Sequence, residues 1–179
     1  GASLELVDPR ADNSQGEAWL ASNEADKPEN EWQTITYRGT VEAPLNALSG
    51  GIDRFHEFIF GLFGAGELLI DDVQVRRDPT GANVNVIQNG GFESGATAWR
   101  LQGTHRQSQV VVDPENPNNH VLRLVATGPQ EYYHNHIETT FAAGNTIAPG
   151  QVYEISYRVK WLRGSNQLNT RLYFDHLAQ

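Results

Sequence analysis

The chain has 179 residues, of which 39% are hydrophobic and 20% are charged, a balance typical of a soluble globular protein. No run approaches the ~18 apolar residues of a transmembrane helix, so we expect no membrane span. The net charge of −9, from 13 basic and 22 acidic residues, opposes binding to a phosphate backbone, so nucleic acid is not an expected partner. The absence of cysteine excludes disulfides and thiolate metal sites.

Alternation of apolar and polar residues predicts short strands along most of the chain. The predicted strands before the C-terminal region are 4–8, 31–43, 55–63, 67–77, 84–88, 107–113, 121–127 and 135–142. Glycine and proline clusters such as "PLNALSGG" and "DPENPNN" separate many of them. Many short strands joined by polar turns predict an all-β protein with an antiparallel sandwich or barrel.

The C-terminal region has the clearest alternation. In "QVYEISYRVKW" the odd-numbered residues from 153 to 161 share one apolar face, which is typical of a half-buried strand. After the turn "RGSNQ", apolar side chains alternate again from residue 168 to residue 174. We therefore predict a hairpin over residues 151–177.

The segment 78–83, within "RRDPTGAN", is the best candidate for a linker, because it has charge, proline and glycine without apolar periodicity. It divides the chain into residues 1–77 and 84–179. Neither part repeats the other, which indicates that they are complementary.

Five motifs in these two parts resemble one family. "NGGFESG…W" at 89–99, "LRL" at 122–124 and "PGQVYEISYRVKW" at 149–161 resemble the first half of the jelly-roll carbohydrate-binding modules of families 4, 9 and 22, in the galactose-binding-like superfamily. "EWQTITYRGTVEAP" at 31–44 and "ELLIDDVQV" at 67–75 resemble the second half. The resemblance covers most of the chain, but the two halves stand in reversed order.

Two architectures agree with the reversed order. In the favoured one, residues 1–179 form a single circularly permuted jelly-roll β-sandwich, in which 78–83 joins the family's last strand to its first. Permutation is tolerated because domain termini usually lie at the surface. In the alternative, 1–77 and 84–179 are two partial modules, each completed by exchange with another chain, because a partial sandwich exposes open strand edges. The single module is preferred since small halves bury too little surface.

The resemblance also implies a structural calcium ion. In the family, acidic residues at the first and last motifs hold this ion, and here they are Glu93, Asp71 and Asp72. Calcium prefers several oxygen ligands, which suits such a set. Alternation allows only one of the two aspartates to point toward a given face. The alternative is that an aspartate caps a turn and that Glu93 is solvated.

A sugar-binding groove needs flat aromatic surfaces beside polar groups. The stretch "PQEYYHNHIET" and the expected 151–177 hairpin supply both kinds of side chain. The candidate ligand-binding residues are Tyr132, Tyr133, His134, Asn135, His136, Arg158, Arg171, Tyr173, Asp175 and, in a separate loop, Trp19. In the same strand Glu138 points away from Ile137, and Arg158, Lys160, Arg163 and Arg171 are expected to form a local basic cluster. The alternative is an ordinary solvated sheet face. The other tryptophans, Trp32, Trp99 and Trp161, are expected in the core.

No motif for nucleophilic, phosphoryl-transfer or dinucleotide chemistry is present, so we predict that the protein is not an enzyme. The expected function is that of an extracellular, non-catalytic carbohydrate-binding module, which recognises a polysaccharide and belongs to a larger multidomain enzyme or cell-surface protein. A structural or protein-interaction β-sandwich is the alternative, since one fold serves both roles. A glycan hydrolase or lyase is the least favoured function.

Overall fold

The computed structural model describes residues 4–6, 19–21, 31–41, 56–130, 134–173, 177 and 178. The chain divides into two compact units, residues 1–31 and 32–179. In the first unit, strand β1 (Leu4–Leu6) pairs antiparallel with β2 (Trp19–Ala21). No helix in the described ranges has the length and apolar character needed to cross a bilayer.

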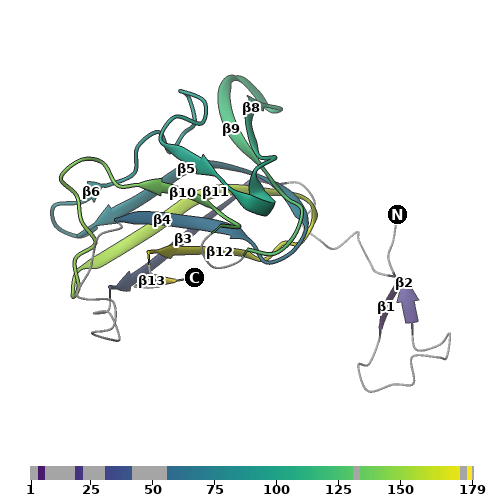
Figure 1. Ribbon diagram of the computed structural model, residues 1–179, viewed down its shortest axis with the longest axis horizontal. Coiled ribbons are helices and arrows are strands. Elements are labelled where there is room, and N and C mark those ends of the chain that lie inside the picture. The colour runs from purple at the N-terminus through teal and green to yellow at the C-terminus, as the bar shows by residue number, and fades with distance from the viewer. Residues whose placement is uncertain are drawn as a thin grey trace. The chain divides into compact units, whose positions relative to one another are not determined.

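The second unit is a sandwich of two antiparallel sheets (Figure 1). The six-stranded sheet has the order β3 (Gln33–Thr40), β11 (Val152–Gly164), β5 (Gly66–Arg77), β9 (Asn116–Ala126) and β8 (Gln109–Asp113), with β6 (Val84–Asn85) also paired to β5. The five-stranded sheet has the order β13 (Leu177–Ala178), β12 (Leu168–Leu172), β4 (Glu57–Leu62), β10 (Ile137–Thr140) and β7 (Trp99–Leu101). A 3-10 turn at Gly103–His105 follows β7. The predicted all-β antiparallel sandwich is confirmed.

Alternation along the strands builds the core between the sheets. On β4, Phe58 and Phe60 point inward and are almost fully buried. They meet Phe92 and Trp99, and the rings of Phe60 and Trp99 lie 5.4 Å apart between centroids in an edge-to-face arrangement, which aromatic pairs favour. The Trp99 indole N–H donates to the carbonyl of Asn89 at 2.9 Å, so its polar atom is satisfied inside the core.

Of the three tryptophans predicted in the core, only Trp99 belongs to it. Trp32 and Trp161 are half-buried and lie outside the core cluster. Trp161 donates to the carbonyl of Gly164, and Trp32 stacks under the guanidinium of Arg158 at 4.6 Å.

Residues 78–83 form a tight turn between two paired strands. The carbonyl of Asp78 accepts hydrogen bonds from the amides of Gly81 and Asn83, and its carboxylate accepts one from the amide of Ala82 at 2.8 Å. Arg77 of β5 then pairs with Val84 of β6. Strands from before and after this turn occur together in both sheets.

The hairpin predicted over residues 151–177 is wrong. Strand β11 pairs with β3 and β5, whereas β12 pairs with β4 and β13 in the other sheet. Between them the chain crosses from one sheet to the other after Gly164, whose φ of +74° lies in the region that glycine adopts without strain. Both strands bury one apolar face in the same core from opposite sides, so alternation alone does not separate this arrangement from a hairpin.

A stability measurement tests whether the two parts of the chain share one core. Phe60→Ala, before the 78–83 turn, and Leu124→Ala, after it, remove buried core side chains. We expect losses of about 3–5 and 2–5 kcal/mol in the free energy of unfolding, respectively. Both changes should shift the same single cooperative transition in urea unfolding followed by circular dichroism. Thr36→Ala, at an exposed position of β3, should leave that transition nearly unchanged. Two transitions, each moved by only one of the core variants, would contradict the shared core.

Candidate functional site on the five-stranded sheet

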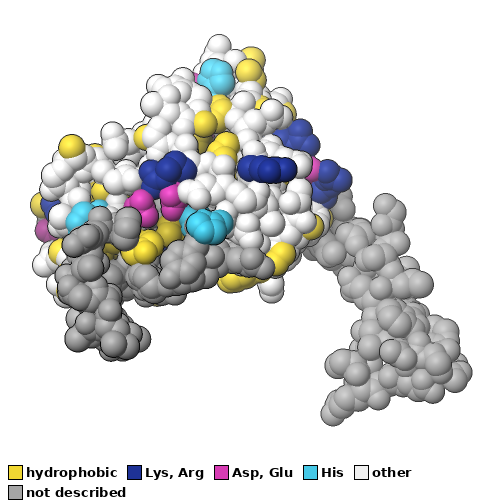
Figure 2. Space-filling view, viewed as in Figure 1, with side chains coloured by type: hydrophobic (Ala, Val, Ile, Leu, Met, Phe, Trp, Pro, Cys, Tyr) yellow, Lys and Arg dark blue, Asp and Glu magenta, His cyan; other side chains and the backbone are white. Residues whose placement is uncertain are grey.

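The outer face of the five-stranded sheet carries a row of side chains from neighbouring strands. Arg100 on β7 lies opposite Glu138 on β10, which lies opposite Ile59 on β4. Their neighbours in sequence, such as Trp99 and Ile137, point into the core, so alternation places the row on the other face. Figure 2 shows basic, acidic and histidine side chains gathered over β10 and β4 on this face.

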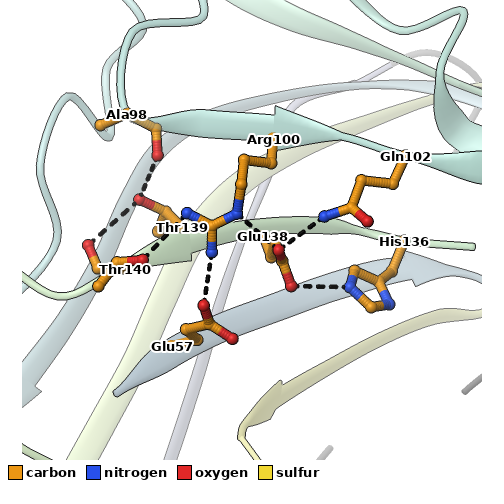
Figure 3. A network of polar contacts seen from close by, with 8 residues as sticks. All are labelled: Glu57, Ala98, Arg100, Gln102, His136, Glu138, Thr139 and Thr140. Carbon is orange, nitrogen blue, oxygen red and sulfur yellow. Dashed lines mark hydrogen bonds and ion pairs between the residues drawn. The ribbon is translucent and has the colours of Figure 1, made fainter. Parts of the chain in front are cut away.

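Arg100 joins three strands through its guanidinium (Figure 3). Its Nε donates to Glu138 Oε1 at 2.6 Å, one terminal nitrogen donates to Glu57 Oε1 at 2.6 Å, and the other donates to Thr140 Oγ1 at 3.0 Å. The side chain of Arg100 is 41% exposed, whereas those of both glutamates are 13% exposed. The guanidinium therefore lies at the surface of the sheet, and the two carboxylates lie beneath it, closer to the strands.

Glu138 is the centre of this network. Besides Arg100, the amide of Gln102 donates to Glu138 Oε1 at 2.6 Å, and His136 Nε2 lies 2.9 Å from Oε2. Burial alone would raise the pKa of Glu138, but the hydrogen bonds from His136 and Arg100 outweigh it and lower the pKa to about 2. The Glu138 side chain is therefore a carboxylate at neutral pH.

Glu57 has the opposite shift. Burial and the nearby Glu138 carboxylate raise its pKa above the ordinary value, in spite of the ion pair with Arg100. A single guanidinium thus serves two carboxylates, and the one with more donors holds its charge more firmly.

Only one of the two ring nitrogens of His136 takes part in the described network. Its side chain is only 4% exposed, and Nδ1 has no hydrogen-bond partner among the described residues. A buried polar atom without a partner is costly, so such an atom beside a polar network indicates a place for a ligand or a water molecule. This nitrogen gives the network an unfilled hydrogen-bonding position.

The buried His105 supports the adjoining part of β4. Its Nε2 accepts a hydrogen bond from the amide of Leu62 at 2.9 Å, so Nδ1 carries the proton and donates to Thr104 Oγ1 at 3.1 Å. Burial, followed by the nearby His136, lowers the pKa of His105 to about 4. His105 is therefore neutral at pH 7, and both of its nitrogens are engaged in holding the fold.

Several predicted ligand-binding residues cannot be placed on this face. Tyr132, Tyr133 and Asp175 lie outside the described residues, and of Trp19 only the backbone, in β2, is described.

The next two predicted residues, His134 and Asn135, lie on the turn before β10. His134 is exposed, and Asn135 Oδ1 accepts from the amide of Thr104 at 3.1 Å. Gly103 beside them has a φ of +53°, and a Cβ there would overlap Asn135, which explains the glycine. Asn135 thus fixes the 3-10 turn.

The predicted basic cluster is divided between the two sheets. Arg171 of β12 lies opposite Ile59 and extends the row of Arg100 and Glu138. Tyr173, just after β12, is half-buried and packs against the core.

The other three members of that cluster belong to β11, in the six-stranded sheet, and each has an acidic partner. Arg158 lies 3.5 Å from Asp71, Lys160 pairs with Glu115, and Arg163 pairs with Glu67. The expectation that these four residues form one local basic cluster is therefore wrong, because it depended on the 151–177 hairpin.

The sequence placed Glu138 on this side of its strand but did not identify it as a ligand-binding residue, and it did not indicate Arg100, Gln102 or Glu57. Arg100 and Gln102 belong to "WRLQ", where they alternate with Trp99 and Leu101. That alternation is consistent with a strand, but it spans too few residues to distinguish a strand from a loop. Glu57 shares its face of β4 with Ile59 and Gly61, so the strand lacks the alternation of polar and apolar residues that would have marked a polar face.

Of the residues predicted to hold calcium, Asp71 and Asp72 lie in the middle of β5, and Glu93 lies in the loop before β7. Asp71 is buried, and its carboxylate accepts hydrogen bonds from the amide of Asp72 at 2.7 Å and from Asn119 Nδ2 at 3.0 Å. Burial raises the pKa of Asp71 in spite of these bonds, so a cation beside it would be favourable. Gly91, two residues before Glu93, lies next to Asp71, because a Cβ there would be 3.9 Å from Asp71 Oδ1.

Glu93 and Asp72 fit the calcium ion less well in this conformation. Glu93 accepts from the amide of His120 at 2.9 Å, and its other oxygen lies 2.9 Å from His120 Nδ1. The side chain of Asp72 is exposed, at a backbone φ of +52°. Within the described ranges, no three histidine, aspartate or glutamate side chains form a metal-binding group. Of the three predicted ligands, only Asp71 therefore has a desolvated carboxylate. Glu93 could bind the same ion only after breaking its contacts with His120.

Comparison with known proteins adds one finding. The sequence model of a family described as "Carbohydrate binding domain", CBM_4_9, matches residues 84–176. This match confirms the family that the motifs at 89–99, 122–124 and 149–161 indicated. No curated protein and no solved structure matches the chain.

The lowered pKa of Glu138 predicts a pH dependence of stability. Because its pKa falls from 4.5 to about 2 on folding, the charged carboxylate stabilises the protein above pH 4.5, and this contribution is lost as the pH falls toward 2. In Glu138→Gln, the free energy of unfolding at neutral pH should be lower, and its decrease between these pH values should be smaller than in the wild type. Urea unfolding across this range measures both. Glu115→Gln, in the turn between β8 and β9 of the other sheet, is the control and should keep the wild-type profile. An equal decrease in wild type and Glu138→Gln would show that the network does not hold this charge.

Proposed function

Because the chain belongs to the CBM_4_9 family of carbohydrate-binding domains, we propose that the outer face of its five-stranded sheet binds a polysaccharide around Arg100, Glu138 and Glu57. The observation that carries this proposal is the polar network itself: a charged carboxylate held by Arg100, Gln102 and His136, with a buried His136 Nδ1 that has no partner among the described residues. A ligand hydroxyl supplies the missing partner.

The chemistry of the network suits sugar hydroxyls. A hydroxyl both donates and accepts, and here carboxylate oxygens lie beside guanidinium and amide donors. The side chains are already held by one another, so binding orders few additional rotamers and loses little entropy. The family match and this preformed polar face support the same proposal independently of each other.

The proposed binding is non-catalytic. Glu57 and Glu138 have pKa values shifted in opposite directions, a pattern also found in pairs of catalytic carboxylates. Here, however, Arg100 bonds to both carboxylates at 2.6 Å. A glycosidase needs one carboxyl group able to deliver a proton and another free to attack or to activate water across the bond, and the shared guanidinium engages both of them.

We also propose that residues 32–77 and 84–179, within the second compact unit, form one circularly permuted module. The occurrence of strands from both parts in each sheet, and the hairpin turn at 78–83, support it. The module would act outside the cell, where polysaccharides are found, within a larger enzyme or surface protein. There it would raise the effective concentration of its partner at the glycan.

Calcium is part of the proposal, with Asp71 as the aspartate that binds it. The burial of Asp71 and the closeness of Gly91 to its Oδ1 support this choice over the exposed Asp72. Calcium there would neutralise a desolvated carboxylate and join the segment that holds Glu93 to β5.

Titration calorimetry tests the sugar site. Folded protein with calcium is titrated with soluble β-glucans, xylans, mannans and uronate polymers. We expect saturable binding to at least one polymer, and Arg100→Met should weaken that binding at least tenfold, because it removes donors and leaves two carboxylates unpaired. Arg38→Met is a matched control: Arg38 is 48% exposed and bonds to Glu154 on the six-stranded sheet, much as Arg100 bonds to Glu138. It should bind like the wild type.

Two results would contradict the sugar proposal. If the wild type binds no polymer of the panel and no glycan on an array, the structural or protein-interaction sandwich would be favoured. Binding that Arg38→Met abolishes and Arg100→Met does not would move the site to the other sheet.

Thermal unfolding tests the calcium proposal. Calcium should raise the Tm of the wild type and of Asp72→Asn over the value in a chelator, since a cation that binds only the folded state stabilises it. The Tm of Asp71→Asn should not respond. A wild-type Tm that is the same in calcium and in chelator would rule the site out.

A further inference from the structure

The six-stranded sheet ends in a long open edge. The outermost strands are β3 and β8 in this sheet and β7 and β13 in the other. Strands β7 and β13 have three and two residues, and the pairing of β8 with β9 is irregular at Val112 and Asp113. Strand β3 has eight residues and pairs with β11 without a register shift. Short or bulged edge strands resist pairing with another chain, whereas a long, flat edge strand is a template for it.

The free edge of β3 is formed by its even-numbered residues. The carbonyl of Val152 on β11 accepts a hydrogen bond at 2.9 Å from the amide of Asp78, which directly follows β5. Bonding directions alternate along an antiparallel strand, so the odd-numbered residues of β11 bond to β3, where each lies opposite an odd-numbered residue. The amides and carbonyls of Thr34, Thr36 and Arg38 therefore point to the open side, where no strand of the described chain pairs with β3.

The side chains of β3 also leave this edge open. Ile35 and Tyr37 pack against the core, yet both are only half-buried, and the side chains that alternate with them are exposed. Strand β3 contains no proline, lysine or acidic residue, and its one charged side chain, Arg38, is paired with Glu154 of β11 at 2.5 Å. Proline, lysine and inward-pointing charges are the usual means by which proteins keep an edge strand from pairing, and β3 has none of them.

We propose that two copies of the chain pair antiparallel along their β3 edges, about a two-fold axis at Thr36, so that their six-stranded sheets form one continuous sheet. In this register Thr36 meets its own copy and Thr34 meets Arg38, and each pair exchanges two backbone hydrogen bonds. On the core side, Ile35 of one copy lies opposite Tyr37 of the other. This pair of an aromatic and a β-branched residue covers two side chains that are half-exposed in the single chain.

Self-complementarity and charge favour a second copy as the partner of this edge. A two-fold contact requires a surface that complements itself, and the register about Thr36 meets this requirement without placing like charges opposite each other. The chain has a net charge of −9, which opposes contacts between copies over an acidic surface. Strand β3 has no acidic residue, so two acidic molecules meet along it without bringing the carboxylates of the paired strands together.

The pairing has a consequence for the other sheet. Directly opposed side chains of an antiparallel pair point to the same face, so the cores of both copies lie on one side of the continuous sheet. Both five-stranded sheets are then on that side, and two Arg100 networks can engage one polymer with a raised effective concentration. This consequence rests on the proposed sugar-binding function, whereas the pairing itself does not.

Sedimentation equilibrium of the full chain tests the pairing. An interface of one strand edge is small, so we expect a reversible dimer whose fraction rises with protein concentration. Thr36→Lys should raise the dissociation constant of the dimer at least tenfold, because like charges then face each other at the axis. An equal amount of Thr36→Glu added to Thr36→Lys should restore a dimer, since unlike charges then meet. Val112→Lys, at an exposed position of the opposite edge strand β8, should keep the wild-type equilibrium.

Three results would overturn the pairing. A wild type that stays monomeric at its highest soluble concentration would leave the edge to an extended segment of another protein. A dimer that Val112→Lys dissociates and Thr36→Lys does not would place the contact on β8. A loss in Thr36→Lys that Thr36→Glu does not restore would rule out the axis at Thr36. None of these measurements uses a sugar, so their outcome is independent of the sugar-binding proposal.

Discussion

The outer face of the five-stranded sheet depends on the Glu138 carboxylate, which is almost out of water and yet charged. Such a group is stable only where hydrogen-bond donors replace its lost hydration. Here the donors are Arg100 on β7, Gln102 directly after β7, and His136 directly before β10. This requirement aligns the three side chains and brings in Glu57 through Arg100, while His136 Nδ1 has no partner in the part of the chain that the structure describes. The polar surface on this face thus exists because protein donors take the place of water around the Glu138 carboxylate.

The sandwich makes this arrangement possible because each strand serves two surfaces. On β4, β7 and β10 one set of side chains packs into the core, including the aromatic contacts of Phe58, Phe60 and Trp99, and the alternate set forms the polar face. The core fixes the strand register, and the register brings Arg100, Glu138 and Ile59 into one row. The six-stranded sheet uses its outer charges differently, as separate pairs such as Arg38 with Glu154 and Lys160 with Glu115.

Alternation in the sequence predicted most of the strands and the sandwich, because a half-buried strand must repeat every two residues. It also predicted that Glu138 points away from Ile137. It did not predict strand partners: residues 151–161 and 168–174 both fit one hairpin by pattern, and the structure places them in different sheets. Arg158 and Lys160 were expected beside Arg171 for that reason alone. Arg100 was missed because β7 has only three residues, which is too few for a periodic signal.

The central claim is that carbohydrate binds on the five-stranded sheet at the Arg100 network, and side-chain NMR tests it most directly. In ¹⁵N-labelled protein, the Arg100 Nε–H and Gln102 amide signals report on the groups that hold Glu138. On titration with a polysaccharide fragment that binds, we expect both signals to shift and to saturate together with backbone amides of β4, β7 and β10. Shifts confined to β3, β5 and β11, with the Arg100 and Gln102 signals unmoved, would contradict it.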